Sequence, residues 1–533
     1  MKENEVNRFE FKKFSNVKNL VWFYPLCICF CVGLMVHFSM YSNGLVTPDG
    51  LWRGEYGYSP QWQVQLGRWA LYIVELVRGG VHSQSLVAFL IILYCATSGI
   101  IIARIFGVKN RLIMTLIGLS IVCSPMVSLF ITYPFTGDAY AFSLLLAATV
   151  VYCLVQVNNR TVRCILGVIC TAFCIGLYQS TLGMILAIVV GHLIVCLLRE
   201  PDELKKHIKK AFEIMGIIFL GALLYYSITI VTQSMWGVTM AEYKGASDVG
   251  FRYLIINLPR SLYNALRDFK NFFVGTNIAR NAFYEGVFYC LLVLISGTKV
   301  VLKFIEMKKN KATVFVLILL FAALPFMCNI IRLLVPDAEI YLLMVSGMMI
   351  IVPLMLAIIG METNDNRSWN MQTTLEVVGK GVVALLLWAY VLSNHIDVEV
   401  MKIGKNQTIT YANWMWMEVQ EHEQYIHGET MVLFAGVPWE NGGKNKSNAT
   451  NKANTYALWG LVWEDFEGSI YTWVEVYRQY LGITYVICPP EIFVEIVQSR
   501  EYQEMPYFPA KGSVEMINGV LVVKISDTSD WQK

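Results

Sequence analysis

The chain has 533 residues, of which 56% are hydrophobic and 15% are charged, whereas soluble proteins carry about 25% charged residues. This composition argues against a soluble globular protein, and the net charge of +3 gives no indication of nucleic-acid binding. Repeated apolar runs of about 20 residues instead predict a polytopic α-helical membrane protein.

The apolar runs predict about eleven transmembrane helices. A basic segment, residues 1–19, precedes the first run, which has no small-x-small cleavage site and is therefore expected to be a retained span. The expected spans cover residues 20–41, 84–104, 112–131, 139–157, 164–178, 181–199, 213–234, 283–301, 312–332, 339–359 and 376–394. Each short loop on the side of the N-terminus carries Lys or Arg, so this side is predicted to be cytoplasmic.

The longer segments on the other side, residues 42–83 and 235–282, are predicted to be outer loops, and the second half of 235–282 has a helical pattern. The end of the first loop, from Trp69 to Arg78, carries Glu75 and Arg78 on an otherwise apolar helix. We expect this helix to lie along the membrane interface rather than to cross it.

The composition changes after the last expected span. Residues 396–533 hold 18 acidic and 10 basic residues, and three β-like runs begin at Met431, Ile483 and Gly519. Helix-like stretches alternate with these runs. The pattern predicts a small extracytoplasmic α/β domain, residues 396–533, attached to a transmembrane catalytic domain, residues 20–395.

Three acidic residues at the outer ends of spans are candidates for catalysis. Asp49 and Glu55 follow the first span, where a carboxylate at the level of the lipid headgroups could accept a proton from a substrate hydroxyl. The sequence Pro48-Asp49-Gly50 is also a common turn. Asp138 follows Gly137 in the short outer hairpin 132–138, where an aspartate also suits the N-cap of the next helix.

Two arginines are candidates for binding a phosphate. Arg68 lies between Gly67 and Trp69 at the membrane edge, where a guanidinium group either binds phosphate with two hydrogen bonds or anchors the chain at the interface. Arg332 ends an expected span, and it either binds a lipid phosphate or pairs with Asp337.

Three further side chains could contact a sugar. Tyr178 and Gln179 connect two expected spans, and the amide of Gln179 can both donate to and accept from a hydroxyl, although it could equally cap a helix. Trp52 could stack on a sugar ring, but an aromatic belt at the membrane interface explains it almost as well.

Four short motifs occur in an order that resembles the glucosyl transferase II family, membrane enzymes of bacteria and phages that modify surface polysaccharides such as O-antigen. The motifs are Asp49 after the first span, Gly67-Arg68-Trp69, the hairpin from Tyr133 to Asp138, and Tyr178-Gln179-Ser180. The resemblance covers roughly residues 20–440.

The resemblance implies a GT-C-like fold, with the active site on the extracytoplasmic side of the cell membrane. It also implies a polyprenyl-phosphate-linked sugar donor, with glucose as the expected sugar, and a polysaccharide or lipid-linked glycan as the acceptor. The family's outer-loop acids correspond to Asp49 and Asp138, and less directly to Glu55. Either the arginines or a divalent metal ion bound to the carboxylates could stabilise the leaving phosphate, and the sequence does not choose between them.

Two alternatives stay open at this stage. A flippase or exporter of lipid-linked sugars would need polar groups along the middle of its membrane helices, and such groups are few in this sequence. A polymerase of lipid-linked sugars would use similar outer residues. Only the fate of the donor's sugar–phosphate bond and the identity of the product distinguish these functions.

Overall fold

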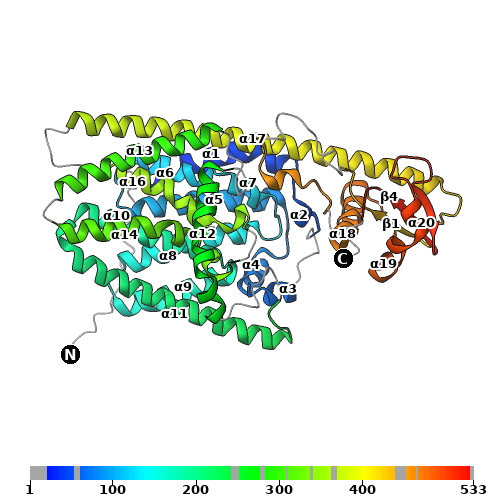
Figure 1. The fold of residues 1–533 in the computed structure, drawn as a ribbon, viewed down its shortest axis with the longest axis horizontal. Coiled ribbons are helices and arrows are strands. Elements are labelled where there is room, and N and C mark those ends of the chain that lie inside the picture. The colour runs from blue at the N-terminus through cyan, green and yellow to red at the C-terminus, as the bar shows by residue number, and fades with distance from the viewer. Residues whose placement is uncertain are drawn as a thin grey trace, which may run out of the picture.

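The computed structural model describes residues 21–52, 60–241, 251–275, 283–307, 310–336, 340–361, 369–438, 452–463 and 466–528. Within these ranges the protein is mostly helical. Long helices form one bundle, and a four-stranded sheet lies beyond one end of the bundle (Figure 1).

Nine helices of the described residues are long and apolar enough to cross a membrane. They are α1 (Phe23–Ser42), α5 (Gln84–Ile105), α8 (Gly137–Gln156), α9 (Arg160–Leu177), α10 (Thr181–Arg199), α11 (Leu204–Trp236), α13 (Phe283–Glu306), α14 (Lys311–Cys328) and α17 (Trp369–Glu421). A tenth span forms if α6 (Arg111–Val122) and α7 (Pro125–Ile131) are counted together, with a bend of 48° between them. The bend lies at Pro125, because proline lacks an N–H group and disfavours helical geometry at the residue before it.

The segment that we expected to be a regular span over residues 339–359 is irregular. It contains the 3₁₀ helices η3 (Leu342–Met344) and η4 (Ser346–Ile350), followed by α16 (Ile351–Ile359). Its apolar part, Ser346–Ile359, is shorter than the about 20 residues of a helical span. A Cβ atom at Gly347 would overlap the carbonyl oxygen of Cys328, so the backbone here approaches the end of α14 more closely than a side chain permits.

Short helices gather at the end of the bundle that faces the sheet. They are α2 (Pro48–Trp52), α3 (Pro60–Gln65) and α4 (Ala70–Arg78), and α7 also lies at this end (Figure 1). With nine residues, α4 is only about 14 Å long and cannot cross a membrane. On another side of the bundle lie α12 (Phe251–Val274), which is the helix expected in segment 235–282, and α15 (Ile330–Leu334).

The helix α17 connects the bundle to the sheet. It has 53 residues and is therefore about 80 Å long, well beyond the about 30 Å of a membrane's hydrocarbon core. We expected a separate outer domain to begin at residue 396, but α17 continues through this position without a break. Figure 1 shows it running along the bundle and on to the sheet.

The sheet has the strand order β2-β1-β4-β3, with β1 (Met431–Ala435), β2 (Val486–Ile487), β3 (Val514–Ile517) and β4 (Val520–Lys524). Strand β1 is parallel to β2 and β4, whereas β3 is antiparallel to β4. The remaining elements of this unit are η7 (Thr455–Leu458), α18 (Phe466–Val476), the π-helical turn η8 (Tyr477–Leu481), α19 (Pro490–Gln498) and α20 (Arg500–Glu504). The predicted runs at Met431 and Gly519 are confirmed as strands, the run at Ile483 pairs over two residues only, and β3 was not predicted.

Tight packing of the bundle depends on small residues. A Cβ atom at Gly99 on α5 would lie 2.7 Å from the Cα atom of Gly118 on α6, so the two backbones touch at this point. Such close approach is the usual way in which membrane helices gain packing energy, because lipid chains are as apolar as the side chains they would replace. It fixes α5 at the centre of the bundle, next to α1, α6 and α8.

Candidate active site

The hairpin 132–138 is the centre of the candidate site. It connects α7 to α8 in a tight turn, in which the N–H group of Gly137 donates to the carbonyl oxygen of Tyr133 at 2.7 Å. Only glycine fits at position 137, since a Cβ atom would overlap the carbonyl oxygen of Phe130. The N-cap of α8 is Thr136, so Asp138 lies in the first helical turn rather than at the N-cap. The positive end of the helix dipole favours a carboxylate at this place.

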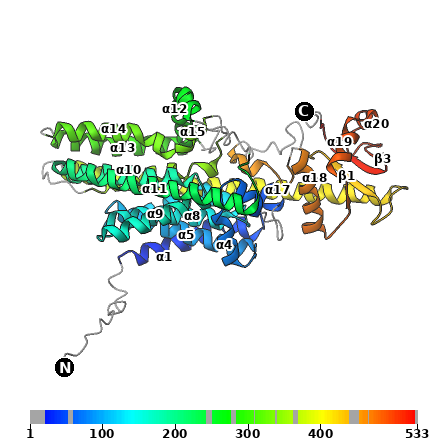
Figure 2. The same ribbon diagram turned by 90° about the horizontal axis from the view of Figure 1, so that it is seen from below.

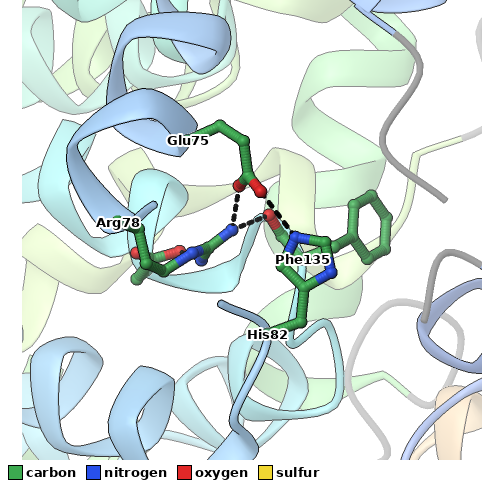
Figure 3. A network of polar contacts seen from close by, with 5 residues as sticks. Glu75, Arg78, His82 and Phe135 are labelled. Carbon is green, nitrogen blue, oxygen red and sulfur yellow. Dashed lines mark hydrogen bonds and ion pairs between the residues drawn. The ribbon is translucent and has the colours of Figure 1, made fainter. Parts of the chain in front are cut away.

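The side chain of Asp138 pairs with Arg78, which comes from the end of α4. Arg78 Nη1 lies 2.5 Å from Asp138 Oδ1, and Nη2 donates to the carbonyl oxygen of Phe135 at 2.7 Å. The same Nη2 atom also contacts the carboxylate of Glu75 one turn earlier on α4 (Figure 3). Only 3–4% of the Asp138 and Arg78 side chains is exposed. The guanidinium group therefore holds α4, the hairpin and the start of α8 together.

Glu75 links Arg78 to His82. His82 Nε2 lies 2.6 Å from Glu75 Oε1, and both side chains are largely buried (Figure 3). Burial alone would raise the pKa of Glu75, but the hydrogen bond with His82 and the charge of Arg78 outweigh it and lower this pKa below its usual value of 4.5. Glu75 is therefore ionised at neutral pH and adds a second negative charge next to Arg78.

The sequence had indicated Glu75 and Arg78 only as the polar residues of an interfacial helix. The structure turns these residues toward the protein, and it adds His82, which no motif had indicated. Residues spaced i, i+3, such as Glu75 and Arg78, share one face of a helix. Nothing in the local sequence identified Asp138 as the partner of that face.

Arg68 lies with Tyr178 and Gln179, two other candidate site residues, although the sequence had not predicted this contact. Arg68 Nε donates to Gln179 Oε1 at 3.3 Å, and Nη1 donates to the hydroxyl of Tyr140 at 3.3 Å. The guanidinium carbon stands 5.1 Å from the centre of the Tyr178 ring. Gln179 Nε2 also donates to the carbonyl oxygen of Leu66 at 2.6 Å, so this amide positions the turn that carries Arg68. Arg68 itself is half-buried.

Asp49 lies in the first turn of α2, which packs on the hairpin 132–138. The N–H group of Thr47 donates to the carbonyl oxygen of Thr132 at 3.4 Å, and a Cβ atom at Gly50 would overlap this same oxygen. Burial and the nearby charge of Asp49 raise the pKa of Tyr133, in the hairpin, well above 10. Asp49 is half-buried, and its Oδ1 accepts a hydrogen bond of 3.3 Å from the indole N–H group of Trp463.

The hairpin 132–138 thus brings together the acidic positions that the structure describes. Asp49 on α2 packs against its first residues, and Arg78 binds Asp138 at its end. Glu55 lies outside the described residues, and Trp52 is the last residue of α2. Among the described ranges, no three or more His, Cys, Asp and Glu side chains are close enough to hold a metal ion.

Arg332 belongs to a different cluster. Its Nε lies 2.7 Å from Asp268 Oδ2 on α12, and its Nη1 donates to the carbonyl oxygen of Pro336 at 3.0 Å. The alternative partner Asp337 lies outside the described residues. Figure 2 shows α12 and α15 on one side of the bundle and α4 on the other. Arg332 is buried, and its charge is balanced by Asp268.

A model of the protein family described as Glucosyl transferase GtrII matches residues 55–352, which is more than half of the chain. The match includes Arg68, Arg78, Asp138 and Gln179, whereas Asp49 lies just before it. No curated protein and no solved structure matches the chain significantly.

Proposed function

The chain belongs to the glucosyl transferase GtrII family, and on this premise we propose that it transfers glucose from a polyprenyl-phosphate donor to a surface polysaccharide or lipid-linked glycan. Membership supports a glycosyltransferase, and the long apolar helices support a multi-pass membrane protein. The donor, the acceptor, a GT-C-like fold and an active site on the extracytoplasmic face are parts of the proposal.

The observation that carries the proposal is the position of the hairpin 132–138. It lies at the end of the bundle that faces the sheet (Figure 1). An open sheet has edge strands with unpaired backbone groups, which lipid cannot satisfy, so this end favours an aqueous environment. The loops at the opposite end are short and basic, with Arg104 and Lys109 before α6 and Arg160 and Arg163 at the start of α9. This distribution favours the cytoplasm for that end and the outer side for the hairpin.

In the proposed reaction, Asp49 acts as the general base. It takes the proton from an acceptor hydroxyl, whose oxygen then attacks the anomeric carbon of the donor with inversion. The bond between that carbon and the phosphate oxygen breaks, and the electron pair leaves with polyprenyl phosphate. This leaving group needs no proton, so one base suffices.

Among the arginines, Arg68 is the best candidate for stabilising the departing phosphate. Arg78 and Arg332 are both buried in ion pairs with carboxylates, Asp138 and Asp268. Arg68 is only half-buried, so its guanidinium group keeps accessible surface for a phosphate, and Gln179 and Tyr140 accept hydrogen bonds that hold it in place. The pairing of Asp138 with Arg78 favours a positioning role for Asp138, which keeps the hairpin in place beneath Asp49.

Membranes that contain the protein, mixed with labelled polyprenyl-phosphate glucose and extracted surface polysaccharide, test the proposal. We expect labelled polysaccharide and free polyprenyl phosphate to form together. Asp49→Asn should reduce transfer by about 10²- to 10⁴-fold, while the purified protein stays monodisperse. Glu501→Gln, which changes an exposed carboxylate on α20, should keep wild-type transfer.

Two results would contradict the proposal. Unchanged transfer in Asp49→Asn would remove this residue from the role of base. Movement of the labelled donor across the membrane without cleavage of its sugar–phosphate bond would instead support a flippase.

A further inference from the structure

The segment 452–463 returns from the outer sheet to the bundle and is held there by a buried carboxylate. Asp397 on α17 accepts hydrogen bonds from the backbone N–H group of Asn454 at 2.7 Å, from its Nδ2 at 2.8 Å and from the hydroxyl of Tyr456 at 2.6 Å. Asp397 is fully buried, and Asn454 is almost so. Because a buried carboxylate with several donors is costly to disturb, the segment has a fixed position on α17.

This segment carries two tryptophans, Trp459 and Trp463, and the second of them contacts α2. The rings of Trp459 and Trp463 are 5.4 Å apart at 42°, and the ring of Tyr341, which precedes η3 in the bundle, lies 6.3 Å from Trp459. Gly460, between the two tryptophans, has a φ of +71°, a left-handed conformation that glycine adopts without strain. The three rings therefore form one row, which we call the aromatic row.

The aromatic row meets the candidate base. Trp463 Nε1 donates to Asp49 Oδ1 at 3.3 Å, so the row ends at this carboxylate. All three rings are half-buried and keep part of their surface accessible. The indole N–H group of Trp459 has no hydrogen-bond acceptor within the part of the chain that the structure describes, so it can donate to a ligand.

This combination of features is suited to a sugar ring. A pyranose presents a face of C–H groups that packs on aromatic rings, and its hydroxyls accept hydrogen bonds from indole N–H groups. A row of rings that ends at a carboxylate would place a hydroxyl of the bound sugar next to that carboxylate. A belt of aromatic residues for lipid headgroups does not require such a contact with an acid.

We propose that Tyr341, Trp459 and Trp463 form the acceptor subsite, which binds a sugar ring of the acceptor glycan so that its attacking hydroxyl reaches Asp49. This inference rests on the proposed function, because it takes Asp49 to be the base. It assigns acceptor recognition in part to the C-terminal unit, beyond the residues that the family model matches.

Kinetics with the full-length protein in detergent test the subsite. With saturating labelled donor, Trp459→Ala should raise the KM for extracted surface polysaccharide about tenfold, with little change in kcat or in the KM for the donor. Trp459→Phe, which keeps an aromatic face but removes the indole N–H group, should give a smaller rise. Trp414→Ala is the matched control, because this exposed tryptophan of α17 packs on Phe508 in the outer unit.

A binding measurement separates this inference from the proposed function. Polysaccharide should bind to Asp49→Asn without donor, and adding Trp459→Ala should weaken that binding about tenfold. If wild-type protein transfers no glucose but this loss of binding is still seen, the proposed function fails, and the aromatic row stands as a glycan-binding site rather than as an acceptor subsite. If transfer occurs and both Trp459 variants keep wild-type acceptor KM and binding, the subsite is refuted. A rise in the donor KM alone would assign the row to the donor and would also refute it.

Discussion

Removing Arg78 should destabilise the protein more than any other single loss of charge at the hairpin 132–138. Arg78 is 4% exposed and contacts two carboxylates, those of Asp138 and Glu75, which are 3% and 11% exposed. In Arg78→Ala the carboxylate of Asp138 stays buried without its cation, whereas Glu75 keeps its contact with His82. Breaking a buried pair by removing one partner costs about 3–5 kcal/mol, and the loss in Arg78→Ala should fall within this range.

Related single variants of the same ion pair should lose less stability than Arg78→Ala. Asp138→Asn leaves Arg78 paired with Glu75, so the loss should be about 1.5–3 kcal/mol, the value of a hydrogen bond to a charged group. Arg78→Lys keeps the charge but replaces the planar guanidinium group by a compact ammonium group, which cannot contact both carboxylates in the same geometry. The stability of this variant should lie between those of Arg78→Ala and the wild type. The double variant Arg78→Ala/Asp138→Asn should lose less than the sum of the single variants, because the two residues share one interaction.

Thermal unfolding of the purified protein in detergent, combined with denaturant titration, measures these differences. The control is Arg500→Ala, which removes a similar pair at 2.7 Å with Glu504, but one in which the side chains are 87% and 66% exposed. Exposed pairs of this kind contribute almost nothing. If Arg78→Ala unfolds at the same temperature as Arg500→Ala, the reasoning about the buried pair is wrong.

Two further predictions concern neighbouring positions. Arg68→Ala should lower kcat for glucosyl transfer by about 10²- to 10³-fold, because a donor to the developing phosphate charge is lost. The kcat of Arg68→Lys should lie between those of Arg68→Ala and the wild type. Equal rates of polyprenyl phosphate release in the three proteins would contradict this prediction. Gly137→Ala should clearly lower the unfolding temperature, because the added Cβ atom would overlap the carbonyl oxygen of Phe130. Gly216→Ala on α11 is the control and should not lower it, because a Cβ atom there faces open space. Similar melting curves for both variants would refute the packing argument.

Length and hydropathy predicted most of the membrane helices, because an apolar run of about 20 residues has few other ways to satisfy its backbone. The irregular segment after Ile340 escaped this reasoning. Its composition is as apolar as that of a helix, but Gly347 lies against the carbonyl end of α14. Such close approach depends on two segments that are distant in sequence, so no local pattern reports it.

The candidate site was predictable only in part for the same reason. The sequence located acids and arginines at the outer ends of spans, since charge there stands out in an apolar chain. It could not assign partners: Arg78 and Asp138 are separated by 60 residues, and Asp49 and Trp463 by 414. Arg332 shows the same difficulty, because its ion pair with Asp268 joins it to α12, 64 residues earlier in the chain.

The continuity of α17 fixes the position of the C-terminal unit relative to the bundle, as the proposed acceptor subsite requires. Sharp bends in helices arise at proline, at π-bulges or where a side chain or water enters the hydrogen-bond ladder, and α17 contains no proline. Asp397 on this helix binds Asn454 and Tyr456, so the aromatic row is attached to the same rigid element that packs against α1 and α13. Movement of the outer sheet relative to the bundle would therefore have to bend α17 or break buried hydrogen bonds. A fixed row beside Asp49 binds a glycan without first having to be ordered, which lowers the entropic cost of placing its hydroxyl.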